Sequence, residues 1–132
     1  MILENDTYVA KAENAIKELA KKKDKYGNPD MVTTTQIRNL LAMTSDIYNE
    51  VCISMDEKLS EDIRGRINYL KVRFIYEAGR GTKQQHQVKD FVETARIIEC
   101  IDEIKGEKKK FILFNKYMEA LIAYHKFYGG KD

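Results

Sequence analysis

The stretch from Asp56 to Gly81 constrains the fold of this chain more than any other, because it is long, lacks proline and has two apolar faces. At about 100° per residue, one face would hold Leu59, Ile63, Ile67, Leu70, Phe74 and Ala78. A second face, nearly opposite, would hold Gly65, Tyr69, Val72 and Tyr76. A helix that is apolar on two sides is either central in its own domain or shared with a neighbour. We therefore predict one long helix over residues 56–81.

Positive charge is concentrated in and just after this stretch. Of the 23 basic residues, seven lie between Arg64 and Lys89, where Glu77 is the only acid. The rest of the chain has 16 basic residues against 20 acidic ones, so it is net negative although the whole chain carries a formal charge of +2. One basic segment in an otherwise acidic chain indicates a defined anionic partner, and a solvated helix face is the alternative.

Four further helices are expected, because apolar residues recur at helical spacing in four other segments. No segment alternates apolar and polar residues as a strand would. We predict them at residues 6–25, 33–52, 88–105 and 107–128. Thr33 with Gln36 has the spacing of a capping box, and Ser54 with Glu57 has the same spacing before the 56–81 helix. With 132 residues, 43% of them hydrophobic, the chain has the size of one domain, over residues 1–132. The expected fold is all-α, a compact bundle of five helices.

The sequence also indicates the cellular compartment of the protein. No apolar run approaches the roughly 20 residues of a membrane span, and the N-terminal residues lack the pattern of a signal peptide. We expect a cytoplasmic protein with no membrane partner. Its two cysteines, Cys52 and Cys100, lack the spacing of a zinc motif, and we expect both to be buried or half-buried free thiols.

Few residues are arranged for catalysis. The chain contains no Walker loop, dinucleotide-binding motif, HExxH sequence or calcium-binding loop. His125 lies on the apolar face of its predicted helix, so we expect a hydrogen-bonded core residue rather than a base. His86 is expected in a loop with no acid at close spacing. These patterns favour a binding protein over an enzyme, with no catalytic residues, no metal site and no cofactor.

Arg80 is the residue that most indicates an anionic ligand. It lies between Gly79 and Gly81 at a predicted helix end, where the backbone can be approached closely and a guanidinium can contact phosphate through two N–H groups. Its alternative role is to cap the last carbonyls of the helix. Arg64 and Lys71 share one flank of the helix and could follow a phosphate backbone. No base-reading motif is present, so we expect sequence-independent, salt-sensitive binding.

Three blocks of sequence then resemble a known family. These are TTTQIRNLLAMTSDIYNEV at residues 33–51, RINYLKVRFIYEAGR at 66–80 and KYMEALIAYHKFYGGKD at 116–132. They are similar to the small subunit of type III-A CRISPR effector complexes, the Csm complex, and the resemblance spans nearly the whole chain. It implies a five-helix protein without catalytic activity, part of an antiviral RNA-guided ribonucleoprotein in which other subunits cleave RNA and DNA.

The resemblance also implies partners and contact residues. Copies of such a subunit stack in a filament beside the backbone subunits that hold the CRISPR RNA, within a complex that also has a large subunit. They contact the phosphate backbone of target RNA paired to the guide. The family's basic positions fall on Arg38, Lys71, Arg73 and Arg80 in the second and third predicted helices. With Arg64 from the charge pattern, the expected RNA-binding set is Arg38, Arg64, Lys71, Arg73 and Arg80.

Two alternatives stay open at this point. The second apolar face of the 56–81 helix is either an interface with a neighbouring subunit or buried under helices of the same chain, and we favour burial. The function is either RNA binding or that of a protein-only helical assembly module with no direct nucleic-acid contact.

Overall fold

The apolar periodicity of the sequence is realised as α-helices throughout the computed structural model, which describes residues 1–28 and 30–130. Six helices are formed within these residues: α1 (Tyr8–Ala20), α2 (Thr34–Ile53), α3 (Glu61–Gly79), α4 (Gln87–Thr94), α5 (Ile97–Asp102) and α6 (Lys108–Phe127). The described part of the chain has no strand, and Lys58 and Glu107 form an isolated β-bridge. The prediction of an all-α bundle is confirmed.

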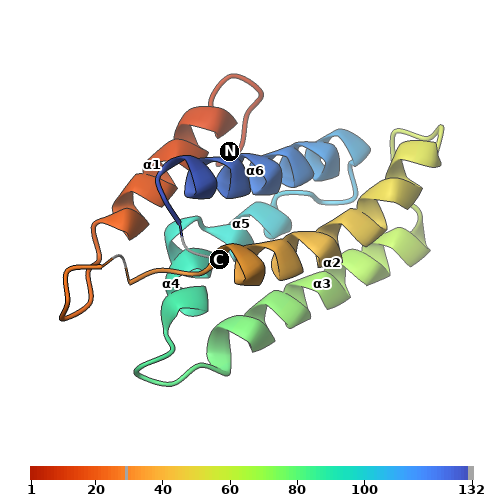
Figure 1. Ribbon diagram of the computed structural model, residues 1–132. Coiled ribbons are helices and arrows are strands. Elements are labelled where there is room, and N and C mark those ends of the chain that lie inside the picture. The colour runs from red at the N-terminus through yellow and green to blue at the C-terminus, as the bar shows by residue number, and fades with distance from the viewer. Residues whose placement is uncertain (29, 131–132) are drawn as a thin grey trace.

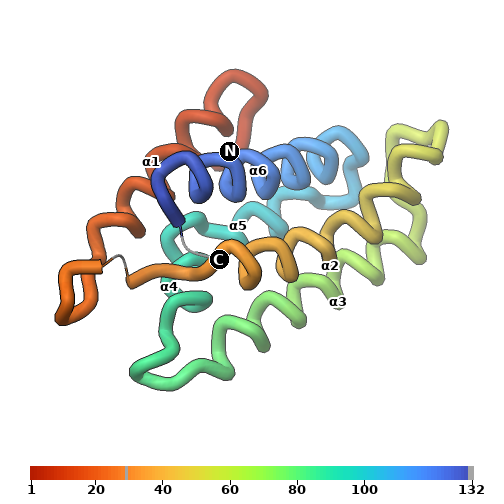
Figure 2. Tube along the Cα trace, viewed as in Figure 1, coloured from red at the N-terminus to blue at the C-terminus, as the bar shows by residue number. Residues whose placement is uncertain are grey.

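The helices pack around one core (Figure 1). α6 packs against both α1 and α2, while α3 runs back along α2 and also contacts α4 and α5. The tube view shows α2 and α3 side by side, joined at one end of the molecule by the connection over residues 54–60 (Figure 2). α3 is therefore supported by neighbours on two flanks.

Aromatic side chains fill the centre of the bundle. Phe74 of α3, Phe91 of α4, and Phe111 and Phe114 of α6 are all fully buried. Each belongs to an apolar face that recurs every three to four residues, which is the spacing that aligns side chains on one side of a helix. Truncating such a phenylalanine typically costs about 3–5 kcal/mol, so these residues account for much of the stability of the bundle.

The predicted start of α2 is confirmed in atomic detail. The backbone N–H of Gln36 donates to Oγ1 of Thr33 at 3.2 Å, and the N–H of Thr33 donates to Oε1 of Gln36 at 2.9 Å. This reciprocal capping box satisfies two N–H groups that would otherwise lack partners. It also fixes the side chain of Gln36 at the end of α2 that faces α3.

The predicted start of α3 is wrong. The helix begins at Glu61, and its N-cap is Ser60, whose Oγ accepts a hydrogen bond from the N–H of Ile63 at 3.2 Å. Ser54 and Glu57 do not form the expected capping box, because Ser54 instead ends α2.

Tertiary hydrogen bonds explain why the preceding residues are not helical. The N–H of Leu59 donates to the carbonyl of Gly106 at 2.8 Å, and the N–H of Lys108 donates to the carbonyl of Glu57 at 3.0 Å. The connection between α2 and α3 is thereby tied to the start of α6, and its backbone groups are no longer available for a helix.

The first helix is also shorter than the predicted range of 6–25. α1 ends at Ala20, and the chain then folds into a loop in which the N–H of Asp24 donates to the carbonyl of Asn28 at 2.8 Å. The N–H of Asp30 closes the loop by donating to the carbonyl of Lys22 at 2.8 Å.

The segment predicted as one helix over residues 88–105 is instead two helices, α4 and α5, which explains why six helices are seen where five were expected. The break lies at Arg96, whose φ of 55° and ψ of 43° are left-handed. In a straight helix the buried residues before the break would point almost opposite to the buried residues after it. The first set is Phe91, Val92 and Ala95, and the second is Ile97, Cys100, Ile101 and Ile104. The left-handed residue turns the second set back toward the core.

The two cysteines differ in environment. Cys100 is buried, as expected, and burial raises the pKa of its thiol to about 12. Cys52 is exposed, so the expectation of burial is wrong for this residue. It follows the buried Val51 on the outward side of the last turn of α2.

Candidate nucleic-acid interface

α3 carries most of the basic side chains that the sequence singled out, and it is held firmly on one side. Ile63, Ile67, Leu70 and Phe74 face the core and are buried. The acids Glu61 and Asp62 lie in its first turn, where they complement the positive end of the helix dipole. The basic residues between the core face and solvent therefore project from a rigid element along two flanks.

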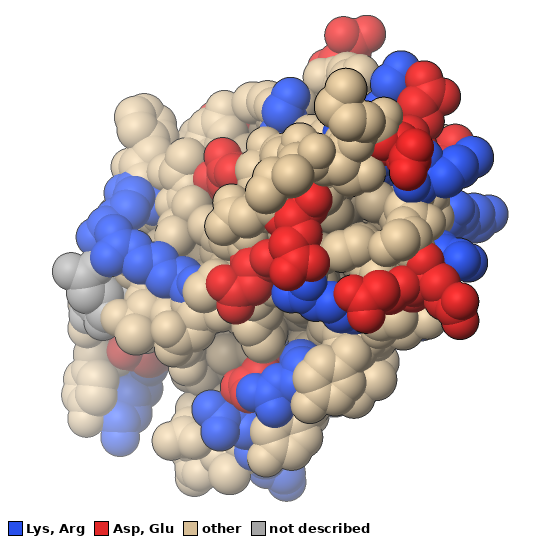
Figure 3. All heavy atoms as spheres, turned by 90° about the vertical axis from the view of Figure 1, so that its right-hand side faces the viewer, with Lys and Arg blue, Asp and Glu red and all other residues tan. Residues whose placement is uncertain are grey.

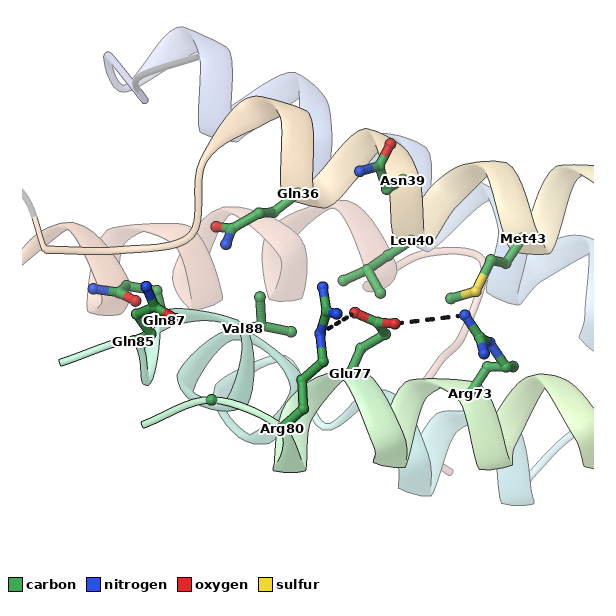
Figure 4. Close-up of a pocket in the computed structure, with 11 residues that line it drawn as sticks. Gln36, Asn39, Leu40, Met43, Arg73, Glu77, Arg80, Gln85, Gln87 and Val88 are labelled. Atoms are coloured by element: carbon green, nitrogen blue, oxygen red, sulfur yellow. Dashed lines mark ion pairs between the residues drawn. The ribbon is translucent and has the colours of Figure 1, made fainter. Parts of the chain in front are cut away.

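One flank of α3 forms a groove with α2 and the start of α4 (Figure 4). The groove has a volume of about 670 Å³. Arg73, Glu77 and Arg80 line it from α3 and its C-cap, and Gln36 and Asn39 line it from α2. Its polar character comes from two guanidinium groups, one carboxylate and several carboxamides, and such groups suit a polar, charged ligand.

Glu77 joins the two arginines of this groove. Its Oε1 lies 3.5 Å from Nη2 of Arg73, and its Oε2 lies 3.0 Å from Nε of Arg80. The side chain of Glu77 is 20% exposed, whereas those of Arg73 and Arg80 are 43% and 63% exposed. Arg80 is the C-cap residue of α3, and its side chain pairs with this carboxylate.

Gly81 shapes the backbone next to Arg80. A Cβ atom built at this position would lie 2.0 Å from the carbonyl oxygen of Gln85, so the turn accepts no side chain here. The expectation that glycine allows a close approach beside Arg80 is met, and the group that approaches is the chain's own backbone.

The opposite flank of α3 faces α5. Nζ of Lys71 lies 2.7 Å from Oδ1 of Asp102, and the aliphatic part of Arg64 packs over Gly106, where a Cβ would lie 3.2 Å from Cδ of the arginine. Both side chains line a shallower hollow of about 360 Å³. The prediction that Arg64 and Lys71 share one flank of α3 is confirmed. Arg66 and Arg73 lie on the flank that faces α2.

Arg38 stands apart from these two flanks. It is exposed on α2 and makes no ion pair with a described residue. At about 100° per residue it lies on the side of α2 away from Gln36 and the groove. The structure therefore brings Arg73 together with Arg80, and Arg64 together with Lys71. Arg38 lies apart from both pairs.

The second apolar face of α3 is exposed, and the expectation that it is buried in the same chain is wrong. Tyr69, Val72, Ile75 and Tyr76 are 63%, 56%, 51% and 55% exposed, respectively. No described atom outside the helix backbone lies within 4 Å of a Cβ built at Gly65. The helices α2 and α5 cover the flanks of α3 and leave this face open. Arg73 extends over the ring of Tyr76, with its guanidinium carbon 5.7 Å from the ring centroid.

The surface view shows how charge is distributed at one end of the molecule (Figure 3). Basic and acidic groups are interspersed over the upper part of this face, whereas the lower part, over α3, shows mainly basic groups beside large uncharged side chains, with fewer acidic atoms among them. Such a combination of cations and exposed aromatic rings is found on proteins that bind single-stranded nucleic acids and on proteins that bind other proteins.

The histidines occupy contrasting places. His125 is fully buried, and its Nε2 lies 2.7 Å from the carbonyl of Val32, so this nitrogen donates and Nδ1 can accept from the hydroxyl of Thr34 at 3.3 Å. This is the hydrogen-bonded core residue that the sequence predicted. In addition, a Cβ at Gly130 would lie 2.0 Å from its ring, so the chain after α6 closes tightly over it.

The expectation that His86 has no acid nearby is wrong. Its Nδ1 lies 2.6 Å from Oδ2 of Asp90, one turn further along, and its Nε2 lies 3.3 Å from Oδ2 of Asp30. The spacing of four residues to Asp90 was a usable signal, whereas the contact with Asp30 depends on the fold. No group of three or more His, Cys, Asp or Glu able to hold a metal occurs among residues 1–28 and 30–130.

No helix in the described part of the chain is both long and apolar enough to cross a membrane.

Comparison with known proteins gives consistent matches. The family model for Csm2 of type III-A matches residues 8–131. A protein of Streptococcus thermophilus described as "CRISPR system Cms protein Csm2" is 46% identical over 131 residues, covering 99% of this chain and 98% of that protein. Proteins of the same description from Enterococcus italicus and Mycobacterium tuberculosis are 39% and 37% identical. The first match covers 89% of this chain and 86% of the relative, and the second covers 96% and 95%.

Proposed function

The chain belongs to the Csm2 family and is a small subunit of a type III-A CRISPR complex, and from this premise we propose that it binds the phosphate backbone of target RNA paired to the guide. It does so as a non-catalytic cytoplasmic subunit, while cleavage is performed elsewhere in the complex. Its partners are the large subunit, the backbone subunits, further copies of itself, the CRISPR RNA and the target RNA.

The convergence of basic side chains along α3 is the observation that carries this proposal. Arg73 and Arg80 meet at one groove, and Arg64 and Lys71 lie on the opposite flank of the same helix. Arginine suits phosphate because its planar guanidinium presents several N–H donors to the phosphate oxygens. A rigid helix with cations on two flanks supports contact with a backbone that repeats its charge at regular intervals. Arg38 adds a contact from α2.

The exposed face of α3 supports stacking between subunits in a filament. Tyr69, Val72, Ile75 and Tyr76 form a row of large, solvent-exposed side chains on one side of a helix. Burying such a row against a neighbouring subunit would remove apolar surface from water, which favours association. The same helix would then serve the RNA along its flanks and a neighbouring subunit along its outer face.

RNA binding can be tested with single substitutions in the full-length chain assembled into its complex. Arg80→Ala and Arg38→Ala should each weaken binding of a guide–target duplex and reduce the slope of log K against log salt by about 0.7–0.9, the value for one lost phosphate contact. The loss should be equal for unrelated target sequences. Lys109→Ala, which removes an exposed cation on α6, is the matched control and should change binding much less.

Binding that is insensitive to salt, or losses that depend on base identity, would contradict contact with the RNA backbone.

A protein-only assembly module is the second candidate, and one observation favours it. Lys71, Arg73 and Arg80 each already pair with a carboxylate of this chain, so the same cations are suited to acidic protein surfaces. In that case the charge reversals Lys71→Glu and Arg80→Glu should disrupt assembly with the other subunits even after all RNA has been removed. If assembly is intact without RNA while RNA binding is lost, the first proposal stands.

A further inference from the structure

The groove between α2 and α3 contains a single acidic side chain, and it lies where the two arginines meet. Among the residues that line the groove, Glu77 is the only carboxylate, and the others are basic, carboxamide or apolar. Each of its oxygens is directed to a different guanidinium, as the dashed lines in Figure 4 show. The negative charge therefore lies between the two cations of the groove.

A carboxylate in this position resembles a bound phosphate group. Both anions offer a guanidinium two acceptor oxygens, and arginine binds both in the same planar, bidentate fashion. Glu77 approaches Arg80 at Nε and Arg73 at Nη2, and each guanidinium has five N–H donors, more than one carboxylate oxygen can occupy. A ligand phosphate can thus meet the arginines at their remaining N–H groups before it competes with the carboxylate.

We propose that Glu77 is an internal counter-ion of this groove, holding in the free protein the position between Arg73 and Arg80 that an RNA phosphate takes in the complex. The inference rests on the proposed function, since it requires that these arginines bind RNA. By neutralising one of the two cations, Glu77 lowers the affinity of the groove for any single phosphate. Tight binding then needs contacts with the other basic side chains of the protein as well. This requirement favours a paired, extended RNA over a ligand with a single phosphate.

The replacement Glu77→Gln tests this directly, because glutamine keeps the shape and one acceptor oxygen but removes the charge. The variant should bind a guide–target RNA duplex about 2- to 5-fold more tightly, the factor expected for relieving one exposed charge interaction. The slope of log K against log salt should steepen by about 0.7–0.9, because one more cation is available to the RNA.

Glu50→Gln is the matched control. Glu50 pairs with Arg66 on the same flank of α3, so this change adds the same net charge to the protein, but Glu50 does not line the groove. If Glu50→Gln tightens binding as much as Glu77→Gln, the effect comes from overall charge and the role of Glu77 as a local counter-ion is overturned. The same conclusion follows if Glu77→Gln leaves binding unchanged or weakens it.

A second substitution localises the effect and guards against a folding artefact. In an Arg80→Ala background, Glu77→Gln should give a smaller gain, because half of the cation pair that it releases is absent, and this double-mutant cycle measures the coupling. Glu77→Ala should also tighten binding, and circular dichroism should show unchanged helicity for each variant. If Arg80→Ala alone leaves RNA binding unchanged, the proposed function fails. If Arg80→Ala weakens binding but Glu77→Gln behaves like Glu50→Gln, only the counter-ion inference fails.

Discussion

His86 lies at the centre of a small charged network that joins two segments distant in sequence. Asp90 belongs to α4, whose N-cap is His86, while Asp30 comes from the segment that precedes α2. Nζ of Lys22 lies 3.4 Å from Oδ2 of Asp90. Gln87 extends the network by donating to Asp30 at 2.8 Å. The imidazole thus links the loop after α1 to the start of α4.

This network makes the stability of the fold depend on pH. The hydrogen bond to Asp90, followed by the charges of Asp90 and Asp30, raises the pKa of His86 above its ordinary value of 6.5, although burial opposes the shift. A raised pKa means that the protonated ring is favoured in the folded state. Its stabilising contribution is therefore complete below pH 6.5 and is lost as the pH rises through the higher pKa of the folded protein.

Thermal unfolding of the wild type and of His86→Gln should show this difference. The loss of melting temperature caused by the substitution should be larger at about pH 5.5 than at about pH 8.5, because only the protonated ring is held by both carboxylates. A loss of the same size at both pH values would contradict the role of the charged imidazole. Since both proteins share all other titrating groups, the comparison isolates His86.

At the scale of elements, the break between α4 and α5 shows how tertiary packing overrides local periodicity. Arg96 has no glycine-like freedom, yet it adopts φ 55° so that Ile97 and Ile101 reach the core. A left-handed conformation costs an ordinary residue roughly 1 kcal/mol, and burial of the isoleucines outweighs that cost.

The break predicts an unusual response to glycine. Arg96→Gly should leave the free energy of unfolding unchanged or raise it by up to about 1 kcal/mol, because glycine adopts positive φ without strain. Lys89→Gly, in the helical part of α4, should instead lower it by about 1 kcal/mol. Urea denaturation of both variants provides the measurement. A loss at Arg96 equal to that at Lys89 would mean that the segment is one continuous helix.

Helices could be predicted from the sequence wherever residues close to each other along the chain determine the conformation. The capping box of Thr33 and Gln36 and the buried face of α3 depend only on residues within a few positions of each other. The segment over residues 54–60 was beyond such rules, because its conformation depends on hydrogen bonds to Gly106 and Lys108, about fifty positions further along. The reversal of the apolar side at Arg96 is also a local signal, because the apolar residues before and after it fall on opposite sides of a straight helix.

The candidate site follows the same division. The two basic flanks of α3 were predicted because the angles between residues on one helix are known in advance. The partners across each flank, Glu50 of α2 and Asp102 of α5, depend on how the helices pack. The open face of α3 was wrongly expected to be buried, because an apolar face in a sequence does not show whether the surface that covers it belongs to the same chain.

At the scale of the whole molecule, α3 has one face in the core and another in solvent. Its core face is occupied by Phe74 and the other buried residues, and its flanks contact α2 and α5. Only the outer face remains, with Tyr69, Val72 and Tyr76 in solvent. The proposed stacking in a filament would use such a surface, and the basic flanks on both sides of it disfavour pairing of two copies through this same face, because like charges would be brought together.

The outer face should therefore matter for assembly and not for folding. The double replacement Tyr69→Gln with Val72→Gln removes apolar surface and introduces glutamine, a good helix former. Each change should therefore alter the free energy of unfolding by no more than about 0.5 kcal/mol. Phe74→Ala, on the core face of the same helix, should lower it by about 3–5 kcal/mol. Association with the other subunits, measured by co-purification after RNA removal and by sedimentation, should be lost in the double variant. If instead the double variant unfolds as readily as Phe74→Ala, the face supports the fold of the chain itself, and the neighbour must bind elsewhere.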